Sequence, residues 1–128
     1  GFGKELGVAF QIRDDIMGIW GEEEKTGKPK YEDVLNRKKT LPVICGWQKS
    51  AGEDREMLSS LYGRQTMSAK DAEQVEGILR RTGAWDYAQS MVEHHYDRAI
   101  QELQASGIGA SSQQDLVRLA DLILGKRD

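Results

Sequence analysis

Apolar residues recur along this chain at intervals of three and four positions, which is the spacing of one face of an α-helix. Glycine, serine and proline interrupt the pattern and mark the loops between helices. The pattern predicts five or six helices, over about residues 4–20, 41–49, 53–62, 69–82, 84–104 and 113–124, with a further helical turn near 32–37. Only two prolines occur in 128 residues. We therefore expect an all-α fold.

Local signals define the ends of several of these helices. Thr40 precedes the 41–49 helix and is expected to be its N-cap, with Pro42 in the first turn. Ser68 and Asp71 form a relative of the capping box, and Ser112 is expected to cap the last helix. The residues expected to face inward include Met57, Leu58, Leu61, Val75, Ile78, Leu79, Tyr87, Leu116, Leu119, Ala120 and Ile123.

The length of 128 residues and the 38% apolar content suit one core, so we expect residues 1–128 to form a single helical domain or a fragment of one. Apolar runs are too short for a membrane span. The lone Cys45 allows no internal disulfide and no zinc site, which favours a soluble protein of the reducing cytoplasm. The start at Gly1 lacks an initiator Met and a signal-peptide pattern, so it is expected to be a cut end.

Charge is unevenly distributed although the total is only −3. Residues 1–24 hold two basic and six acidic residues, whereas residues 25–39 hold six basic and two acidic ones. A nucleic-acid-binding protein is expected to carry a broad basic face with aromatic residues between the charges. The short basic segment fits a small anionic ligand better, and no nucleic-acid partner is expected.

Asp14 and Asp15 lie in the middle of the most apolar predicted helix, where an unpaired carboxylate would be costly. Gln11 shares their edge of the helix. Two carboxylates that face a cleft are typical of a Mg²⁺ site, since Mg²⁺ takes further ligands from water and substrate phosphates. The basic residues that follow, Lys28 and Arg37 to Lys39, would meet those phosphates. The alternative is a solvated aspartate pair, or a local salt bridge to Arg13 or Lys4.

The chain resembles a known family over essentially its whole length. The matching segments are Phe-Gly at 2–3, Leu-Gly-Val-Ala-Phe-Gln-Ile-Arg-Asp-Asp-Ile at 6–16, Thr-Gly-Lys-Pro at 26–29, Asp-Val at 33–34 and Arg-Lys-Lys-Thr-Leu-Pro at 37–42. In order and spacing these segments resemble the trans-prenyl diphosphate synthases, also called polyprenyl synthetases. The resemblance implies the C-terminal part of the isoprenoid synthase helical bundle.

The resemblance also implies a site and an activity. It implies that Asp14 and Asp15 bind Mg²⁺ bridged to an allylic diphosphate or pyrophosphate, and that Lys28 contacts the same diphosphate. Phe10 and Gln11 would border the pocket. Lys38 and Lys39 match the lysines of the family's basic segment. The implied reaction is a Mg²⁺-dependent condensation of an allylic diphosphate with isopentenyl diphosphate.

Two departures from the family pattern modify these expectations. The motif usually reads Asp-Asp-x-x-Asp, and Gly18 replaces its third aspartate. The family's first aspartate-rich motif lies upstream and is not in this chain. We therefore expect no catalytic residue beyond the metal ligands, little activity of the chain alone, and either a homo-oligomer or association with a missing N-terminal half. The alternative is a non-catalytic helical subunit or scaffold that modulates a complete synthase.

Overall fold

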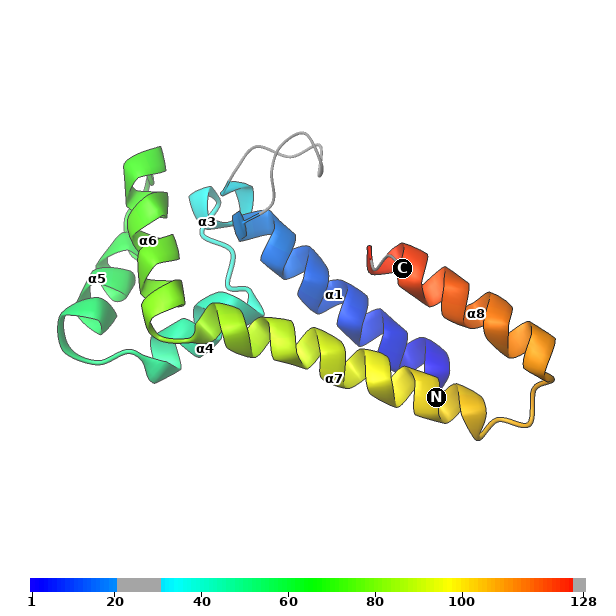
Figure 1. Cartoon of the computed structure of the whole chain (residues 1–128). Coiled ribbons are helices and arrows are strands. Elements are labelled where there is room, and N and C mark those ends of the chain that lie inside the picture. Colours follow the sequence, from blue (N-terminus) through cyan, green and yellow to red (C-terminus); the bar gives the residue numbers. More distant parts are fainter. Residues whose placement is uncertain (21–30, 126–128) are drawn as a thin grey trace. The chain divides into compact units, whose positions relative to one another are not determined.

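The computed structural model describes residues 1–20 and 31–125, and every regular element within them is an α-helix, as the apolar pattern predicts. The helices are α1 Phe2–Trp20, α3 Glu32–Leu35, α4 Leu41–Lys49, α5 Gly52–Tyr62, α6 Ala69–Arg81, α7 Ala84–Gln104 and α8 Ala110–Ile123 (Figure 1). Residues 21–30, which follow the first predicted helix, and residues 126–128 lie outside the described part of the chain.

The chain packs as two compact units, which we describe separately. The central unit is Asp14–Gln89, and the terminal unit combines Gly1–Arg13 with Ser90–Asp128. Helices α1 and α7 each contribute residues to both units. The expectation of one domain over residues 1–128 stays a prediction.

Helix α6 is the centre of the central unit, because α3, α4 and α5 all contact it (Figure 1). Its inward face follows the helical period predicted for it, with Ala72, Val75, Ile78 and Leu79 buried. These side chains join a core that also contains Ile19, Tyr31, Val34, Val43, Cys45, Leu58, Leu61 and Ala84. A side chain at Gly46 would overlap the Leu79 side chain. Glycine therefore lets α4 lie close to α6.

In the terminal unit, polar contacts join three helical segments. Glu5 of α1 accepts a hydrogen bond from His95 Nδ1 of α7 at 2.6 Å and pairs with Arg98 Nε at 3.3 Å. Tyr96 donates to Asp121 Oδ1 of α8 at 2.6 Å. The hydrogen bond from His95, aided by the charge of Arg98, lowers the pKa of Glu5 below its ordinary value of 4.5 against the opposing effect of burial.

Several local expectations are wrong. Helix α8 begins at Ala110 with Gly109 as its N-cap, so Ser112 lies inside the helix and does not cap it. Met57, Tyr87 and Leu119 are exposed, although their spacing places them beside buried neighbours. Spacing along a helix defines a face but not how much of that face another helix covers, and single exposed apolar side chains are common on protein surfaces.

The capping box at the start of α6 generates a stability prediction. Ser68 Oγ accepts from the Asp71 N–H, and Asp71 Oδ2 accepts from the Ser68 N–H, each at 3.1 Å. We expect Ser68→Ala to lower the free energy of unfolding by about 1 kcal/mol, measured by urea denaturation. The control is Ser60→Ala, at an exposed position in the middle of α5, which should change the free energy of unfolding by less than about 0.5 kcal/mol. Equal effects of the two changes would contradict the prediction.

The Glu5 contact predicts a pH dependence. Because folding lowers the pKa of Glu5, its carboxylate stabilises the folded chain above the unfolded pKa, and this stabilisation is lost as the pH falls through the folded pKa. We expect Glu5→Gln to lower the melting temperature at pH 7 and to converge with the unsubstituted chain well below pH 4.5. Thermal unfolding followed by circular dichroism across this range is the measurement. The exposed Glu102→Gln is the control and should show no such convergence.

Candidate functional site

Asp15 is the acidic residue that α1 buries in the central unit, with 8% of its surface exposed. Its Oδ2 accepts a hydrogen bond at 3.3 Å from the backbone N–H of Leu41, the first residue of α4. The positive end of a helix dipole favours an anion there. Thr40, expected to cap α4, occupies the N-cap position, but its hydroxyl makes no capping bond and is buried without a hydrogen-bond partner. Asp15 supplies the acceptor instead.

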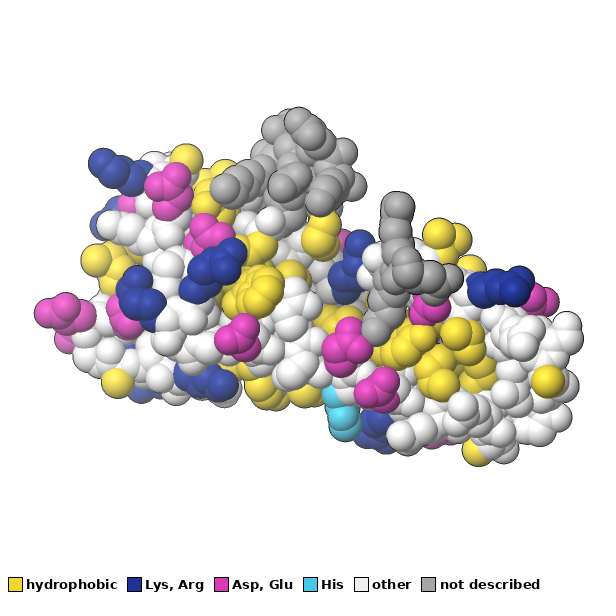
Figure 2. Space-filling view, viewed as in Figure 1, with side chains coloured by type: hydrophobic (Ala, Val, Ile, Leu, Met, Phe, Trp, Pro, Cys, Tyr) yellow, Lys and Arg dark blue, Asp and Glu magenta, His cyan; other side chains and the backbone are white. Residues whose placement is uncertain are grey.

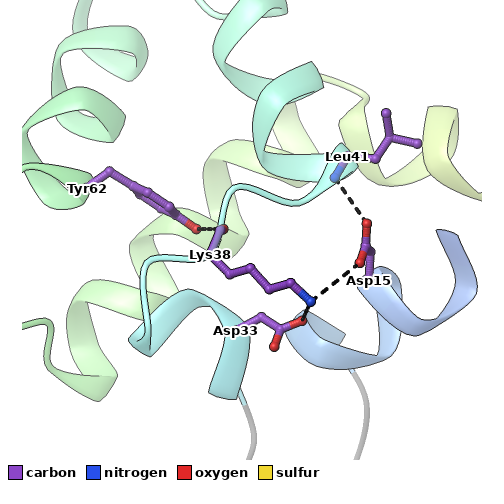
Figure 3. A network of polar contacts seen from close by, with 5 residues as sticks. All are labelled: Asp15, Asp33, Lys38, Leu41 and Tyr62. Atoms are coloured by element: carbon purple, nitrogen blue, oxygen red, sulfur yellow. Dashed lines mark hydrogen bonds and ion pairs between the residues drawn. The ribbon is translucent and has the colours of Figure 1, made fainter. Parts of the chain in front are cut away.

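Lys38 lies between two buried carboxylates. Its Nζ is 4.0 Å from Asp15 Oδ1 and 4.0 Å from Asp33 Oδ2, and Figure 3 shows the ammonium pointing into the space between them. The lysine side chain is half exposed, whereas both carboxylates are almost fully covered. The spacing is longer than that of a direct charge-assisted hydrogen bond. The ammonium therefore balances the two charges without being fixed to either.

Asp33 fills the space beside Gly18. A side chain added at Gly18 would overlap the carboxyl group of Asp33. Asp33 is only 7% exposed, yet its buried Oδ2 has no hydrogen-bond partner. A buried carboxylate oxygen without a donor is costly unless a cation compensates it.

The segment that carries Asp33 and Lys38 is anchored at both ends. Tyr31 and Arg37 both adopt left-handed backbone angles, with φ of 64° and 54°. Tyr31 donates to Glu76 Oε1 of α6 at 2.7 Å, and Arg37 donates to the Gln65 carbonyl at 2.7 Å. Burial, together with this bond to Glu76, raises the pKa of Tyr31 to about 12. Side-chain bonds to the rest of the unit thus offset an unfavourable backbone conformation.

Tyr62 of α5 fixes the backbone of Lys38 from a third side. Its hydroxyl donates to the Lys38 carbonyl at 3.2 Å (Figure 3). Burial, and then the negative charge of Asp33, raises the pKa of Tyr62 above its ordinary value of 10, so the phenol keeps its proton and remains a donor. The position of the lysine main chain is therefore well defined, while its side chain remains exposed.

The structure brings two of the predicted site residues together within the central unit. Asp15 and Lys38 meet, and Asp14 is half-buried beside Asp15 in the same helix. Lys39 is exposed and borders an apolar cavity of about 390 Å³, between α4 and α5, that is lined also by Val43, Ile44, Trp47, Gln48, Leu58, Ser59 and Tyr62. Phe10 and Gln11 are exposed residues of the terminal unit. Lys28 lies outside the described residues.

Two contacts were not foreseen from the sequence. Asp33 was noted only as part of a matching segment, and the signal that points to it is the glycine at position 18, whose missing side chain leaves room for another carboxylate. His95 meets Glu5 across 90 positions of sequence. Nothing in the spacing of these two residues reveals that contact.

The carboxylate oxygens of this cluster are ligands of the kind that Mg²⁺ prefers, but they are few. Within residues 1–20 and 31–125, no cluster of three or more His, Cys, Asp or Glu side chains is arranged to hold a metal ion. Asp15 and Asp33 offer hard oxygen ligands. Asp33 Oδ2 is buried without a hydrogen-bond donor, and a cation would compensate its charge. Because Mg²⁺ keeps several waters and takes phosphate oxygens, two carboxylates are a sufficient protein contribution. The residues fit such an ion.

The surface of the central unit carries side chains of both charges. On the face drawn in Figure 2, basic and acidic side chains are interspersed over the central unit, and no broad basic face is formed there. None of the helices in the described part of the chain is both long and apolar enough to cross a membrane.

Comparison with known proteins shows where these features recur. The polyprenyl synthetase family model matches residues 1–79. The chain is 34% identical to a geranylgeranyl diphosphate synthase of Mycobacterium tuberculosis over 122 residues, which are 95% of the chain and 34% of that protein. It is 37% identical to a geranylfarnesyl diphosphate synthase of Aeropyrum pernix over 95% of the chain and 37% of that protein.

Solved structures give the same result. A polyprenyl synthetase from Streptomyces coelicolor superposes with a TM-score of 0.88 at 26% identity, over 95% of this chain and 38% of that one. A Corynebacterium glutamicum geranylgeranyl pyrophosphate synthase, solved with isoprenyl diphosphate and magnesium, gives 0.88 at 26% identity, over 98% and 36%. The chain spans little more than a third of its relatives' length, and its all-α architecture is that of the C-terminal part of the isoprenoid synthase bundle. By its sequence and its fold, the chain belongs to the polyprenyl synthetase family.

Proposed function

We propose that this chain is part of a Mg²⁺-dependent prenyltransferase that condenses an allylic diphosphate with isopentenyl diphosphate. The observation that carries the proposal is the pairing of a buried carboxylate, Asp15, with a half-exposed lysine, Lys38, in segments that match this family. Relatives of the chain are named as synthases of geranylgeranyl, farnesyl and geranylfarnesyl diphosphate. These names support the class of substrate.

In this proposal the chain holds the leaving diphosphate of the allylic substrate. Asp14 and Asp15 would be the carboxylates that bind Mg²⁺, and Lys28, Lys38 and Lys39 would neutralise phosphate oxygens. Bound Mg²⁺ would stabilise the negative charge that develops on the diphosphate as it departs. The allylic carbon then bonds to isopentenyl diphosphate, and a proton is lost. Phe10 and Gln11 would border the pocket.

The proposal requires a second set of metal ligands, which the family pattern assigns to a first aspartate-rich motif that the given sequence does not include. A leaving diphosphate is stabilised by charges placed around it, and one motif covers only one side. Large apolar side chains are exposed on the chain, among them Phe10, Ile44, Trp47 and Leu122. Exposed apolar surface of this kind favours association, so we propose that the chain functions as a homo-oligomer or together with further polypeptide.

The metal requirement predicts different effects of two substitutions. We expect pyrophosphate to bind the chain only with Mg²⁺ present, because carboxylates and pyrophosphate repel each other until a divalent cation bridges them. Asp15→Asn should lower the affinity for Mg²⁺ about tenfold or more, so pyrophosphate binding should depend less on added Mg²⁺. Lys28→Ala should weaken pyrophosphate binding at every Mg²⁺ concentration.

Isothermal titration calorimetry with Mg²⁺ and with EDTA is the measurement for both variants. Asp54→Asn is the matched control, since Asp54 pairs with Arg81 on the surface at 2.8 Å and should leave binding unchanged. Equal affinity for pyrophosphate in Mg²⁺ and in EDTA would contradict the metal requirement and leave Asp14 and Asp15 with a structural role.

Because the second set of metal ligands is missing, we predict that the 128-residue chain alone is inactive. With an allylic diphosphate, isopentenyl diphosphate and Mg²⁺, we expect no measurable chain elongation in a radiolabel transfer assay. Turnover at ordinary enzyme rates of about 1 s⁻¹ or more would contradict the account of the missing motif.

A further inference from the structure

The central unit contains an apolar cavity between α4 and α5, two helices that contact each other (Figure 1). Its volume of about 390 Å³ is within the range of small-molecule sites. Val43, Ile44 and Trp47 of α4 and Leu58 of α5 contribute apolar side chains to its lining. The aspartates of the proposed metal site do not line it, so it is a separate feature of the surface.

The two hydroxyl groups that line the cavity already take part in hydrogen bonds within the chain. Ser59 Oγ accepts from Trp47 Nε1 at 2.9 Å, and the Tyr62 hydroxyl donates to the Lys38 carbonyl at 3.2 Å. A ligand in this cavity therefore meets mainly hydrocarbon. Its binding would be favoured by the burial of its own apolar surface.

Trp47 is a fixed wall of the cavity, although 44% of its surface is exposed. The guanidinium carbon of Arg55 lies 3.9 Å from the centroid of the indole ring, and Arg55 Nε donates to the Trp47 carbonyl at 3.2 Å. Arg55 lines a neighbouring hollow and not this cavity, so the ring separates the two. A wall that is already ordered lowers the entropic cost of binding.

Lys39 is the charged residue among those that line the cavity. Within residues 1–20 and 31–125, no carboxylate forms an ion pair with Lys39, whereas the Lys38 ammonium lies 4.0 Å from two carboxylates. Lys39 precedes α4, and Gln48 lines the cavity near the other end of that helix, about 10 Å further along its axis. The cavity thus has a cation at one end and apolar walls along its length.

We propose that this cavity binds one hydrocarbon chain that carries an anionic head, with the head beside Lys39 and the chain along Ile44 and Trp47. A purely apolar occupant would make no use of the charge of Lys39. An extended peptide would bring backbone polar groups into the cavity, where the engaged hydroxyls offer them few partners. The inference goes beyond the proposed function, and in it Lys39 binds this head rather than the departing diphosphate.

The direct test is a calorimetric titration of decanoate, below its critical micelle concentration, into the purified 128-residue chain in EDTA. We expect one saturable site per chain. The affinity should rise about threefold to fourfold for each methylene added between octanoate and decanoate, because each one buries further apolar surface. The uncharged 1-decanol should bind more weakly than decanoate.

Two matched pairs of variants locate the ligand. Ile44→Gln should lower the affinity for decanoate about fivefold or more. Met57→Gln changes an apolar residue of α5 that is similarly exposed but lies outside this cavity, and it should leave the affinity unchanged. Lys39→Gln should weaken decanoate binding about threefold and leave 1-decanol binding unchanged. Lys49→Gln, on α4 but outside the cavity, should change neither.

Three results would each overturn the inference: no saturable binding of decanoate, an unchanged affinity in Ile44→Gln, or an equal loss of decanoate and 1-decanol binding in Lys39→Gln. Geranyl monophosphate, added as a competitor, distinguishes the source of the ligand. Stronger binding than that of decanoate assigns the site to a prenyl phosphate, and weaker binding assigns it to a fatty acid. Because EDTA removes the Mg²⁺ that the proposed function requires, failure here leaves that function standing.

Discussion

The central unit buries negative charge, and its structure depends on the groups that compensate this charge. Asp15 and Asp33 are both more than nine-tenths covered, and an isolated carboxylate in such surroundings is costly. The N–H of Leu41 and the ammonium of Lys38 reduce this cost, and in doing so they join the end of α1 to the start of α4 and to the 31–38 segment. The polar cluster therefore organises the same elements that the apolar core around α6 packs together.

Much of the helical architecture follows from local sequence, because its determinants are local. Helices at 41–49 and 84–104 were predicted with the bounds that the structure has, and the capping box of Ser68 and Asp71 forms as expected. The failures occur where a distant group takes over a local role. Thr40 is correctly placed to cap α4, but the acceptor for the Leu41 N–H comes from Asp15, 26 positions away. No pattern near residue 40 contains that information.

The site was predictable to the extent that residue type and burial define it. Aspartates in an apolar helix followed by a basic segment indicated an anion and a divalent cation, and Asp15 and Lys38 do meet. The position of Asp33 was not predictable, since it depends on the space beside Gly18 and on the approach of the Lys38 ammonium. Both are properties of three-dimensional packing. A glycine in a sequence shows that a side chain is absent, and not which residue from another element packs against it.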